Sequence, residues 1–366
     1  MNIKKTIYQI LIGIVFLQNN NRIQAVSETN EELFSNKKIL ILGGTGYLGR
    51  AIALELLKYN PREVYLFSRD EVKHFNVSKI FHAYPNVKHI IGDIRDFDSL
   101  LKATKNMDIV FHVAALKRMD MLESNVDEAI KTNILGSLNV FNACVQNEVK
   151  KVLFVSTDKA CSPINIYGAC KFASEKIFTN YDKAKISTKF VTSRFGNILD
   201  STGSVIPIFI EKIKNNEEIP LTDGQMTRFI IYKDEAVKLM FDALRYTDGG
   251  EIFSKKLLAF KITDLIDVLR DHFKASNKTR FIGIRPGEKM HEMMINESEM
   301  LRTYEFDNYY IILSSLNNKD IEKGTNLPIY RGQGRPLSES MIYYSSDQAV
   351  IPPNELISHF KNLGLL

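Results

Sequence analysis

Residues 38–49 read KILILGGTGYLG, a strand-like apolar run followed by a turn that contains four glycines. The glycines fit two spacings of a phosphate-binding turn, Gly43-x-x-Gly46-x-x-Gly49 and Gly44-x-Gly46-x-x-Gly49. Glycine permits the tight turn, the close approach of a pyrophosphate to the backbone, and the packing of the next helix on the strand. The stretch therefore predicts a first strand, a following helix, and a dinucleotide held by Gly43, Thr45, Gly46, Tyr47, Leu48 and Gly49.

Further apolar runs alternate with helical patterns along the first half of the chain. Strands are expected at residues 64–67, 87–91, 109–113, 152–155 and 189–194, and helices at 47–58, 123–145 and 167–180. The helix at 123–145 could also be two helices with a break near Gly136. Short apolar strands that alternate with helices predict an α/β fold with a Rossmann-like, doubly wound parallel sheet. Ligands bind at the carboxyl ends of such strands, so the residues that follow each strand are the candidates for a functional site.

The regular alternation of strands and helices becomes less clear after Asn197. The second half is therefore expected to form a smaller, discontinuous substrate lobe. The expected division is a leader or linker at 1–35, a dinucleotide-binding domain at 36–200, the lobe mainly at 201–346, and a C-terminal tail helix at 347–366. A segment near 229–254 is expected to return to the sheet domain, because residues 235–244 read as a helix.

The tip of the second strand, at Ser68, Arg69 and Asp70, bears on the choice of cofactor. An acidic side chain here would bind a ribose 2′-hydroxyl and favour NAD, whereas a hydroxyl and a guanidinium suit the 2′-phosphate of NADP. We favour NADP because Ser68 and Arg69 come first, and Asp70 keeps NAD as the alternative. The other candidate cofactor contacts, at the ends of the third and fourth strands, are Asp93, Ile94, Ala114, Ala115 and Lys117. For Asp93 a helix cap is an equal alternative.

The candidate catalytic groups follow the fifth strand, in residues 156–160 (STDKA) and 167–171 (YGACK). Tyr167 and Lys171 are one helical turn apart and face the same way. The Lys171 ammonium is expected to lower the pKa of the phenol and to hold the nicotinamide ribose, so that Tyr167 can accept a hydroxyl proton as hydride leaves. Once a sugar hydroxyl has become a ketone, the neighbouring C–H is acidic. Lys159, with a depressed pKa, could remove that proton, and Asp158, with a raised pKa, could expel a β-hydroxyl as water. The competing interpretation is a structural Asp-Lys turn.

Polar residues beyond the fourth strand could bind a nucleotide sugar. Arg228 and Arg285 carry guanidinium groups that match phosphate oxygens, and Glu288 could accept a hydrogen bond from a ribose hydroxyl. The candidate substrate-binding residues are Lys117, Asn197, Ser204, Val205, Arg228, Arg285 and Glu288.

Charge and cysteine content exclude several classes of function. The 366 residues carry a formal charge of +5 without long basic runs, so nucleic-acid binding has no support. Three scattered cysteines are too few for a disulfide framework or a structural metal site, so no metal is expected and a reducing compartment is indicated. Lys4 and Lys5 precede an apolar run at 7–17 that resembles a secretory signal. A leader with membrane contact through residues 1–20 is the other interpretation. We favour a cytoplasmic enzyme, because nucleotide sugars are made and used mainly in the cytosol.

Four stretches carry a family resemblance: 156–160 (STDKA), 163–168 (PINIYG), 226–229 (MTRF) and 285–289 (RPGEK). Together they resemble the inverting UDP-N-acetylglucosamine 4,6-dehydratases, within the extended short-chain dehydrogenase/reductases. The resemblance runs from about Lys38 to about Ser346. STDKA is the most discriminating piece, because retaining 4,6-dehydratases carry Asp-Glu there. Thr202 stands where the family commonly has an arginine, which weakens a diphosphate site around residues 201–204.

The resemblance implies a course of reaction. NADP would take a hydride from C4 while Tyr167 accepts the O4 proton. Lys159 would remove the C5 proton and Asp158 would protonate the departing C6 hydroxyl. Return of hydride to C6 and protonation of C5 from the opposite face would give a UDP-linked 4-keto-6-deoxy-L-hexose, a precursor for pseudaminic acid or surface polysaccharide. The resemblance also implies a homo-oligomer.

Other functions stay open from the residues alone. A nucleotide-sugar 4-epimerase would use Tyr167 and Lys171 but has no evident need for Lys159 as a base. A non-catalytic nucleotide-binding scaffold, with the leader as its membrane contact, would bind cofactor without turnover. The intact set of Asp158, Lys159, Tyr167 and Lys171 favours an enzyme over this scaffold. A simple alcohol dehydrogenase fits poorly with the long second lobe.

Overall fold

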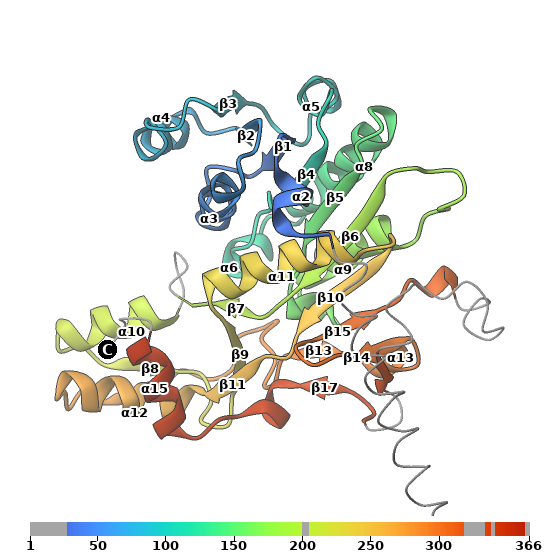
Figure 1. The fold of residues 1–366 in the computed structure, drawn as a ribbon. Coiled ribbons are helices and arrows are strands. Elements are labelled where there is room, and N and C mark those ends of the chain that lie inside the picture. Colours follow the sequence, from blue (N-terminus) through green and yellow to red (C-terminus); the bar gives the residue numbers. More distant parts are fainter. Residues whose placement is uncertain (1–27, 200–204, 318–333, 338–340, 363–366) are drawn as a thin grey trace, which may run out of the picture.

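The computed structural model describes residues 28–199, 205–317, 334–337 and 341–362, and Figure 1 shows how they are arranged. A large sheet with helices on both faces forms one part, and a smaller group of helices and strands lies at the lower left of the view. Within these described ranges, no helix combines the length and the apolar character needed to cross a membrane.

The large sheet has ten strands and confirms the predicted fold class. Its first six strands in the chain are parallel and lie in the order β6-β5-β4-β1-β2-β3. The chain order reverses between β1 and β4, and the carboxyl ends of strands at such a reversal flank the crevice where ligands bind. The six are β1 (Lys38–Leu42), β2 (Glu63–Ser68), β3 (Val87–Ile91), β4 (Ile109–His112), β5 (Lys151–Val155) and β6 (Lys189–Arg194).

Helices cover both faces of this sheet, so successive side chains of β1 enter two different cores. Ile39 and Ile41 pack beneath α3 (Tyr47–Leu56) and α11 (Lys233–Tyr246). Leu40 and Leu42 pack beneath α5 (Phe97–Ala103), α8 (Gly136–Gln146) and α9 (Ile166–Thr179). Burial on both sides explains why the strands read as continuous apolar runs rather than as alternating ones. Helix α4 (Glu71–Ile80) packs beside β3.

Regular structure is present before residue 36, where the first domain was expected to begin. Residues Asn30–Phe34 form helix α2, which starts with a capping box between Thr29 and Glu32. Leu33 and Phe34 are buried, and the Phe34 ring lies 4.5 Å from the ring of Phe241 on α11, between centroids. The expected leader at 1–35 is therefore corrected, because these apolar side chains join the main core. Residues 1–27 lie outside the described residues.

The long helix expected at 123–145 contains a π-helical turn. Its range holds α7 (Val126–Ala129), a π-helical turn at Ile130–Leu135 and α8, which follow one another without a gap, and the short α6 (Met119–Leu122) precedes it. The alternative of one helix therefore agrees with the structure, and a π turn just before Gly136 takes the place of a break. Such turns often lie at functional sites, and this one carries Thr132 and Asn133.

The segment after residue 229 returns to the sheet and extends it further than expected. Helix α11 packs on α3, β5 and β6, and β10 (Glu251–Lys255) pairs in parallel with β6. Antiparallel pairing then adds β15 (Tyr309–Ile312), β14 (Thr303–Glu305) and β16 (Arg335–Pro336). The expected lobe at 201–346 is corrected accordingly, because β15 buries Ile311 and Ile312 in the core of the sheet.

The lobe is discontinuous and has a core of its own, which includes Phe209, Leu265 and Phe360. Its helices are α10 (Val205–Lys214), α12 (Ile262–Phe273) and α15 (Pro353–Asn362). Its strands form the sheets β11-β9-β7 (Leu258–Lys261, Thr227–Ile231, Asn197–Ile198) and β12-β8 (Thr279–Phe281, Ile219–Leu221). A separate pair, β13 (Met293–Ile295) and β17 (Tyr344–Ser345), precedes and follows α13 (Glu297–Met300) and lies beside the turn at Asp158–Ala160.

Candidate active site

The glycine-rich turn joins β1 to α3 and leaves no room for a side chain at three of its glycines, Gly43, Gly44 and Gly49. A Cβ at Gly43 would lie 2.8 Å from the backbone nitrogen of Ala114, and Gly43 has a φ of +86°. A Cβ at Gly49 would lie 2.4 Å from the carbonyl oxygen of Gly43. Gly46 precedes α3 and brings no capping side chain, so the helix presents backbone donors and its positive dipole end at this turn. The turn therefore fits the pyrophosphate of a dinucleotide.

At the end of β2, Ser68 and Asp70 are held in different ways. Ser68 Oγ lies 2.8 Å from Thr45 Oγ1 and 3.0 Å from His74 Nε2, which ties the strand tip to the glycine turn. The Asp70 carboxylate accepts the backbone N–H of Lys73 at 2.9 Å and pairs with the Lys73 ammonium at 3.3 Å. Asp70 is thus engaged as the N-cap of α4. Arg69 lies beside it, with its Nη1 3.6 Å from Asp93 Oδ2.

Asp93 and Ile94 follow β3 and form the next side of the site. Asp93 Oδ2 accepts from Arg95 Nη2 at 2.7 Å, and Oδ1 accepts from the Arg95 backbone N–H at 3.0 Å. Burial alone would raise the pKa of Asp93, but Arg95 and Arg69 outweigh it and lower the pKa. The side chain of Ile94 is buried and would contact a Cβ placed at Gly136, at 2.8 Å. Asp93 is thus not the cap of the next helix, because the N-cap of α5 is Asp96; it holds Arg95 and lines the cleft.

The end of β4 is fixed by the π turn. The side-chain oxygen of Asn133 accepts the backbone N–H of Leu116 at 2.8 Å, and its amide donates to the Leu116 carbonyl, also at 2.8 Å. This clamp holds Ala114, Ala115 and Lys117 along the cleft. Partial burial lowers the pKa of Lys117.

Tyr167 and Lys171 both project from α9 into the cleft. Lys171 Nζ donates to the carbonyl of Val155 at 2.7 Å, and burial lowers the pKa of Lys171 to about 8. Burial raises the pKa of Tyr167 to about 12, and the cation that opposes this rise is Lys159. The expectation that Lys171 lowers the pKa of the phenol is corrected: burial dominates, and Lys171 is turned toward the end of β5.

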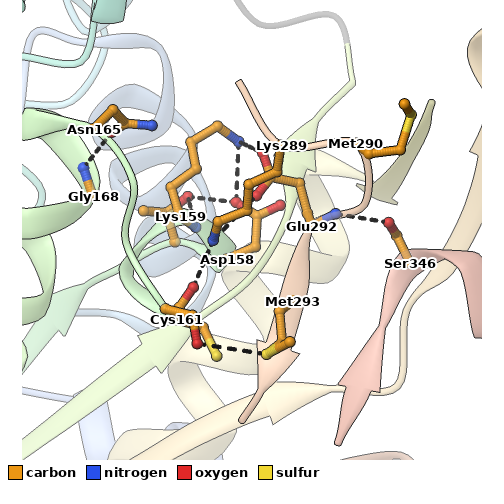
Figure 2. A network of polar contacts seen from close by, with 12 residues as sticks. Asp158, Lys159, Cys161, Asn165, Gly168, Lys289, Met290, Glu292, Met293 and Ser346 are labelled. Carbon is orange, nitrogen blue, oxygen red and sulfur yellow. Dashed lines mark hydrogen bonds and ion pairs between the residues drawn. The ribbon is translucent and has the colours of Figure 1, made fainter. Parts of the chain in front are cut away.

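Asp158 and Lys159 lie in a 3-10 turn (Asp158–Ala160) directly after β5 and are buried. Lys159 Nζ donates to Asp158 Oδ1 at 3.1 Å and to Asn197 Oδ1 at 3.2 Å. It also pairs with Glu292 Oε1 at 3.2 Å. Figure 2 shows the Lys159 ammonium between the two carboxylates.

The charges around Lys159 contradict the expected pKa shift of Lys159 and agree with the expected shift of Asp158. Burial would lower the pKa of Lys159, but Asp158 and Glu292 outweigh burial and raise it. The expected depressed pKa is therefore wrong for this arrangement, because a second carboxylate reaches the ammonium. Burial raises the pKa of Asp158 despite the nearby lysine, in the expected direction.

The candidate substrate residues come together from several elements. Arg228, on β9, is buried and donates through Nη1 to the carbonyls of Thr227 at 2.7 Å and Met290 at 3.2 Å. The Glu288 carboxylate accepts the backbone N–H of Arg285 at 3.3 Å and so closes its own loop. Ser204 lies outside the described residues.

One cleft with a volume of about 1470 Å³ joins these groups. Such sites usually have volumes of about 300–1,000 Å³ for one small ligand, so the cleft has room for two ligands of nucleotide size. Apart from Ser204 and the fully buried Asp158, every candidate residue lines it. They are Gly43, Thr45, Gly46, Tyr47, Leu48, Gly49, Ser68, Arg69, Asp93, Ile94, Ala114, Ala115, Lys117, Lys159, Tyr167, Lys171, Asn197, Val205, Arg228, Arg285 and Glu288.

Three contacts that close the site were not predictable from the motifs in the sequence. Glu292 pairs with Lys159, Lys289 Nζ donates to the Cys161 carbonyl at 2.6 Å, and Asn165 Nδ2 donates to the Gly287 carbonyl at 2.8 Å. The only signal in the sequence was the dense polar cluster that includes 285–289, which predicted ligand contacts rather than these links.

A family model described as polysaccharide biosynthesis protein matches residues 39–314. The chain is 40% identical over 319 residues to the UDP-N-acetylglucosamine 4,6-dehydratase (inverting) of Campylobacter jejuni, covering 86% of this chain and 94% of that protein. It is 41% identical over 286 residues to the UDP-glucose 4-epimerase of Rickettsia bellii, covering 76% of this chain and 84% of that protein. The two identities are nearly equal, but the match to the dehydratase extends over more of both chains.

A solved structure supports the same relationship. The X-ray structure of Pen from Bacillus thuringiensis aligns with a TM-score of 0.80 and 36% identity, over 90% of this chain and 98% of that one. The similarity thus includes both the sheet domain and the lobe.

Proposed function

Because this chain belongs to the polysaccharide biosynthesis protein family, we propose that it is a C5-inverting UDP-N-acetylglucosamine 4,6-dehydratase. The observation that carries the proposal is the buried Asp158–Lys159 pair, bonded at 3.1 Å, in which Lys159 lines the same cleft as Tyr167 and Lys171. A 4-epimerase needs the Tyr-Lys pair for redox chemistry. An acid and a base directly after β5 supply the groups for an elimination as well.

Residues of the glycine turn and of the ends of β2 and β4 would hold a nicotinamide dinucleotide, which supplies a hydride acceptor for C4 and a hydride donor for C6. The protein's own first step is proton transfer. Tyr167 accepts the O4 proton as a phenolate, so the phenol, whose pKa is raised by burial, must first release its own proton to solvent. Lys159 opposes that rise in pKa and so assists ionisation of the phenol.

The elimination requires neutral Lys159 and protonated Asp158. This form holds the same single proton as the ion pair, so transfer of one proton along the 3.1 Å hydrogen bond interconverts the two. A substrate that fills the cleft excludes water and disfavours the charged form. Lys159 then removes the C5 proton, and Asp158 protonates the C6 hydroxyl as it leaves as water. Inversion requires the later protonation of C5 on the opposite face.

For the cofactor we propose NADP rather than NAD. Asp70, which could bind a ribose 2′-hydroxyl, is occupied by capping α4. Arg69 and Lys73 line the cleft at the same place and suit a 2′-phosphate. A comparison of the two dinucleotides by titration calorimetry tests this, and tighter binding of NAD would contradict it.

The wider setting also follows as a proposal. The product would be a UDP-4-keto-6-deoxy-L-hexose for pseudaminic acid or surface polysaccharide, made in the cytoplasm where nucleotide sugars are available. We infer a homo-oligomer, because exposed apolar side chains lie on neighbouring helical segments: α7, the π turn, α8 and α9. They are Val126, Ile130, Leu135, Leu138 and Phe172. Membrane contact through residues 1–20 concerns residues outside those described and stays a prediction.

The decisive test is incubation of the protein with UDP-N-acetylglucosamine in deuterated water, followed by NMR. We expect a 4-keto-6-deoxy product that carries deuterium at C5 and has the L configuration. A product with the D configuration would contradict inversion.

The 41% identity to a UDP-glucose 4-epimerase makes epimerisation the second candidate. It predicts a 4-epimer without deuterium at C5 in the same experiment. Lys159→Ala separates the two further, because a dehydratase loses its turnover and an epimerase keeps it.

A further inference from the structure

Glu292 reaches the catalytic pair from the far side of the cleft. It lies just before β13, and its side chain is buried with 3% exposure. Its Oε1 is 3.2 Å from Lys159 Nζ, while its backbone N–H donates to Ser346 Oγ at 3.0 Å. Ser346 Oγ in turn lies 2.6 Å from Thr227 Oγ1. Figure 2 shows this carboxylate opposite Asp158, with the lysine between them.

The second oxygen of Glu292 is buried, and Glu292 lines the cleft. Neither Glu292 Oε2 nor Asp158 Oδ2 has a hydrogen-bond partner among the described residues. Buried carboxylate oxygens without partners are costly unless they serve a function. Each carboxylate therefore uses one oxygen to hold Lys159, while the second oxygen of Glu292 lies 3.8 Å from the Lys289 ammonium.

Other charged groups around Lys159 act on the pair as well. Arg228, on β9, opposes the positive charge of Lys159, and Tyr167, on α9, is the remaining titratable neighbour. Burial alone would raise the pKa of Glu292, but Lys159, Arg228 and Lys289 outweigh it and lower the pKa. Glu292 is thus an anion at neutral pH.

We propose that Glu292 is a positioning residue of the elimination, which holds Lys159 against Asp158 and keeps one proton on that pair. The inference rests on the proposed dehydratase function. With two protons on the pair, Lys159 is charged and is no base; with none, Asp158 is no acid. The negative charge of Glu292 attracts the proton and moves the one-proton range to higher pH.

The test is the pH dependence of kcat for 4-keto-6-deoxy product in Glu292→Gln, which has nearly the same shape without the charge. Loss of the anion lowers the pKa of both Lys159 and Asp158. Both limbs of the bell-shaped profile should therefore move to lower pH, by about one pH unit. Transient reduction of the nicotinamide should persist, because oxidation at C4 uses Tyr167 and Lys171.

Glu299→Gln is the matched control. Glu299 is equally buried but pairs with Arg194, at 2.8 Å. Its loss should lower stability without moving either limb. Glu292→Asp keeps the charge one methylene further from Lys159, so both limbs should move to lower pH by less than in Glu292→Gln.

The outcomes separate the two proposals. Wild-type protein that gives no C5-deuterated product refutes the dehydratase function itself. If wild type gives that product but the limbs of Glu292→Gln stay in place, Glu292 is only structural. Should Glu292→Gln not fold, the profile of Glu292→Asp decides: a smaller shift in the same direction supports the inference, and an unmoved profile overturns it.

Discussion

Replacement of Gly49 by alanine tests the cofactor turn most directly. The new Cβ would lie 2.4 Å from the carbonyl oxygen of Gly43, 2.7 Å from Gly44 Cα and 3.0 Å from Gly44 C. All three are backbone atoms and cannot rotate away. To reach ordinary contact, the start of α3 must retreat by about 1 Å from the turn.

The expected magnitude combines two opposing effects. Overpacking costs about 1–3 kcal/mol, and the backbone contacts place this site at the upper end. The higher helix propensity of alanine relative to glycine stabilises the helix by about 1 kcal/mol. The free energy of unfolding should therefore fall by about 2 kcal/mol. Affinity for the nicotinamide dinucleotide should fall about tenfold or more, because the backbone donors leave the phosphate position.

Denaturant titration and titration calorimetry measure the two quantities. Gly224→Ala is the matched control, since a Cβ there would meet only the Thr263 methyl group, at 3.7 Å, and should change stability by less than about 0.5 kcal/mol. Unchanged cofactor affinity in Gly49→Ala would refute the assignment of this turn to the cofactor. An equal loss of stability in Gly224→Ala would refute the reasoning from contacts.

Three further predictions concern buried groups. The pKa of Lys171 is about 8 in the folded protein and 10.5 ordinarily. Between these two pH values the folded protein binds fewer protons than the unfolded chain, so the free energy of unfolding rises with pH by about 3 kcal/mol. In a pH series of denaturant titrations Lys171→Met should lack this rise, and the same rise in the variant and the wild type would contradict the prediction. Arg194→Met leaves Glu175 and Glu299 without their buried partner and should cost about 3–5 kcal/mol in a urea titration, whereas a neutral result would show that the carboxylates find other partners. Phe34→Ala should lower the unfolding free energy by about 3–5 kcal/mol, and a loss below about 1 kcal/mol would mean that α2 is not part of the core.

The parallel strands could be predicted because burial on both faces requires continuous apolar runs. All six expected ranges agree with β1 to β6 within one residue at either end. The added strands β14, β15 and β16 could not be predicted in the same way. They are short, and they owe their place in the sheet to antiparallel pairing with partners distant in the chain. Local periodicity carries no information about such pairing.

The site residues likewise include some that local sequence could predict and some that depend on long-range packing. Residues at or shortly after the end of a strand, such as Ser68, Lys117 and Asp158, were predictable because the topology brings strand ends to one edge. Glu292 follows no strand of the large sheet, and its role depends on how the lobe packs against the turn at Asp158–Ala160.

The raised pKa of Lys159 is consistent with a role as base once the pair is treated as one titrating unit. Asp158 and Lys159 share a hydrogen bond, so their protons belong to the pair rather than to either residue. An environment that raises both pKa values retains the single proton needed for one base and one acid. A lysine with a depressed pKa beside an ionised aspartate would have supplied the base but not the acid. The second carboxylate therefore serves the elimination by conserving the proton that the departing hydroxyl must receive.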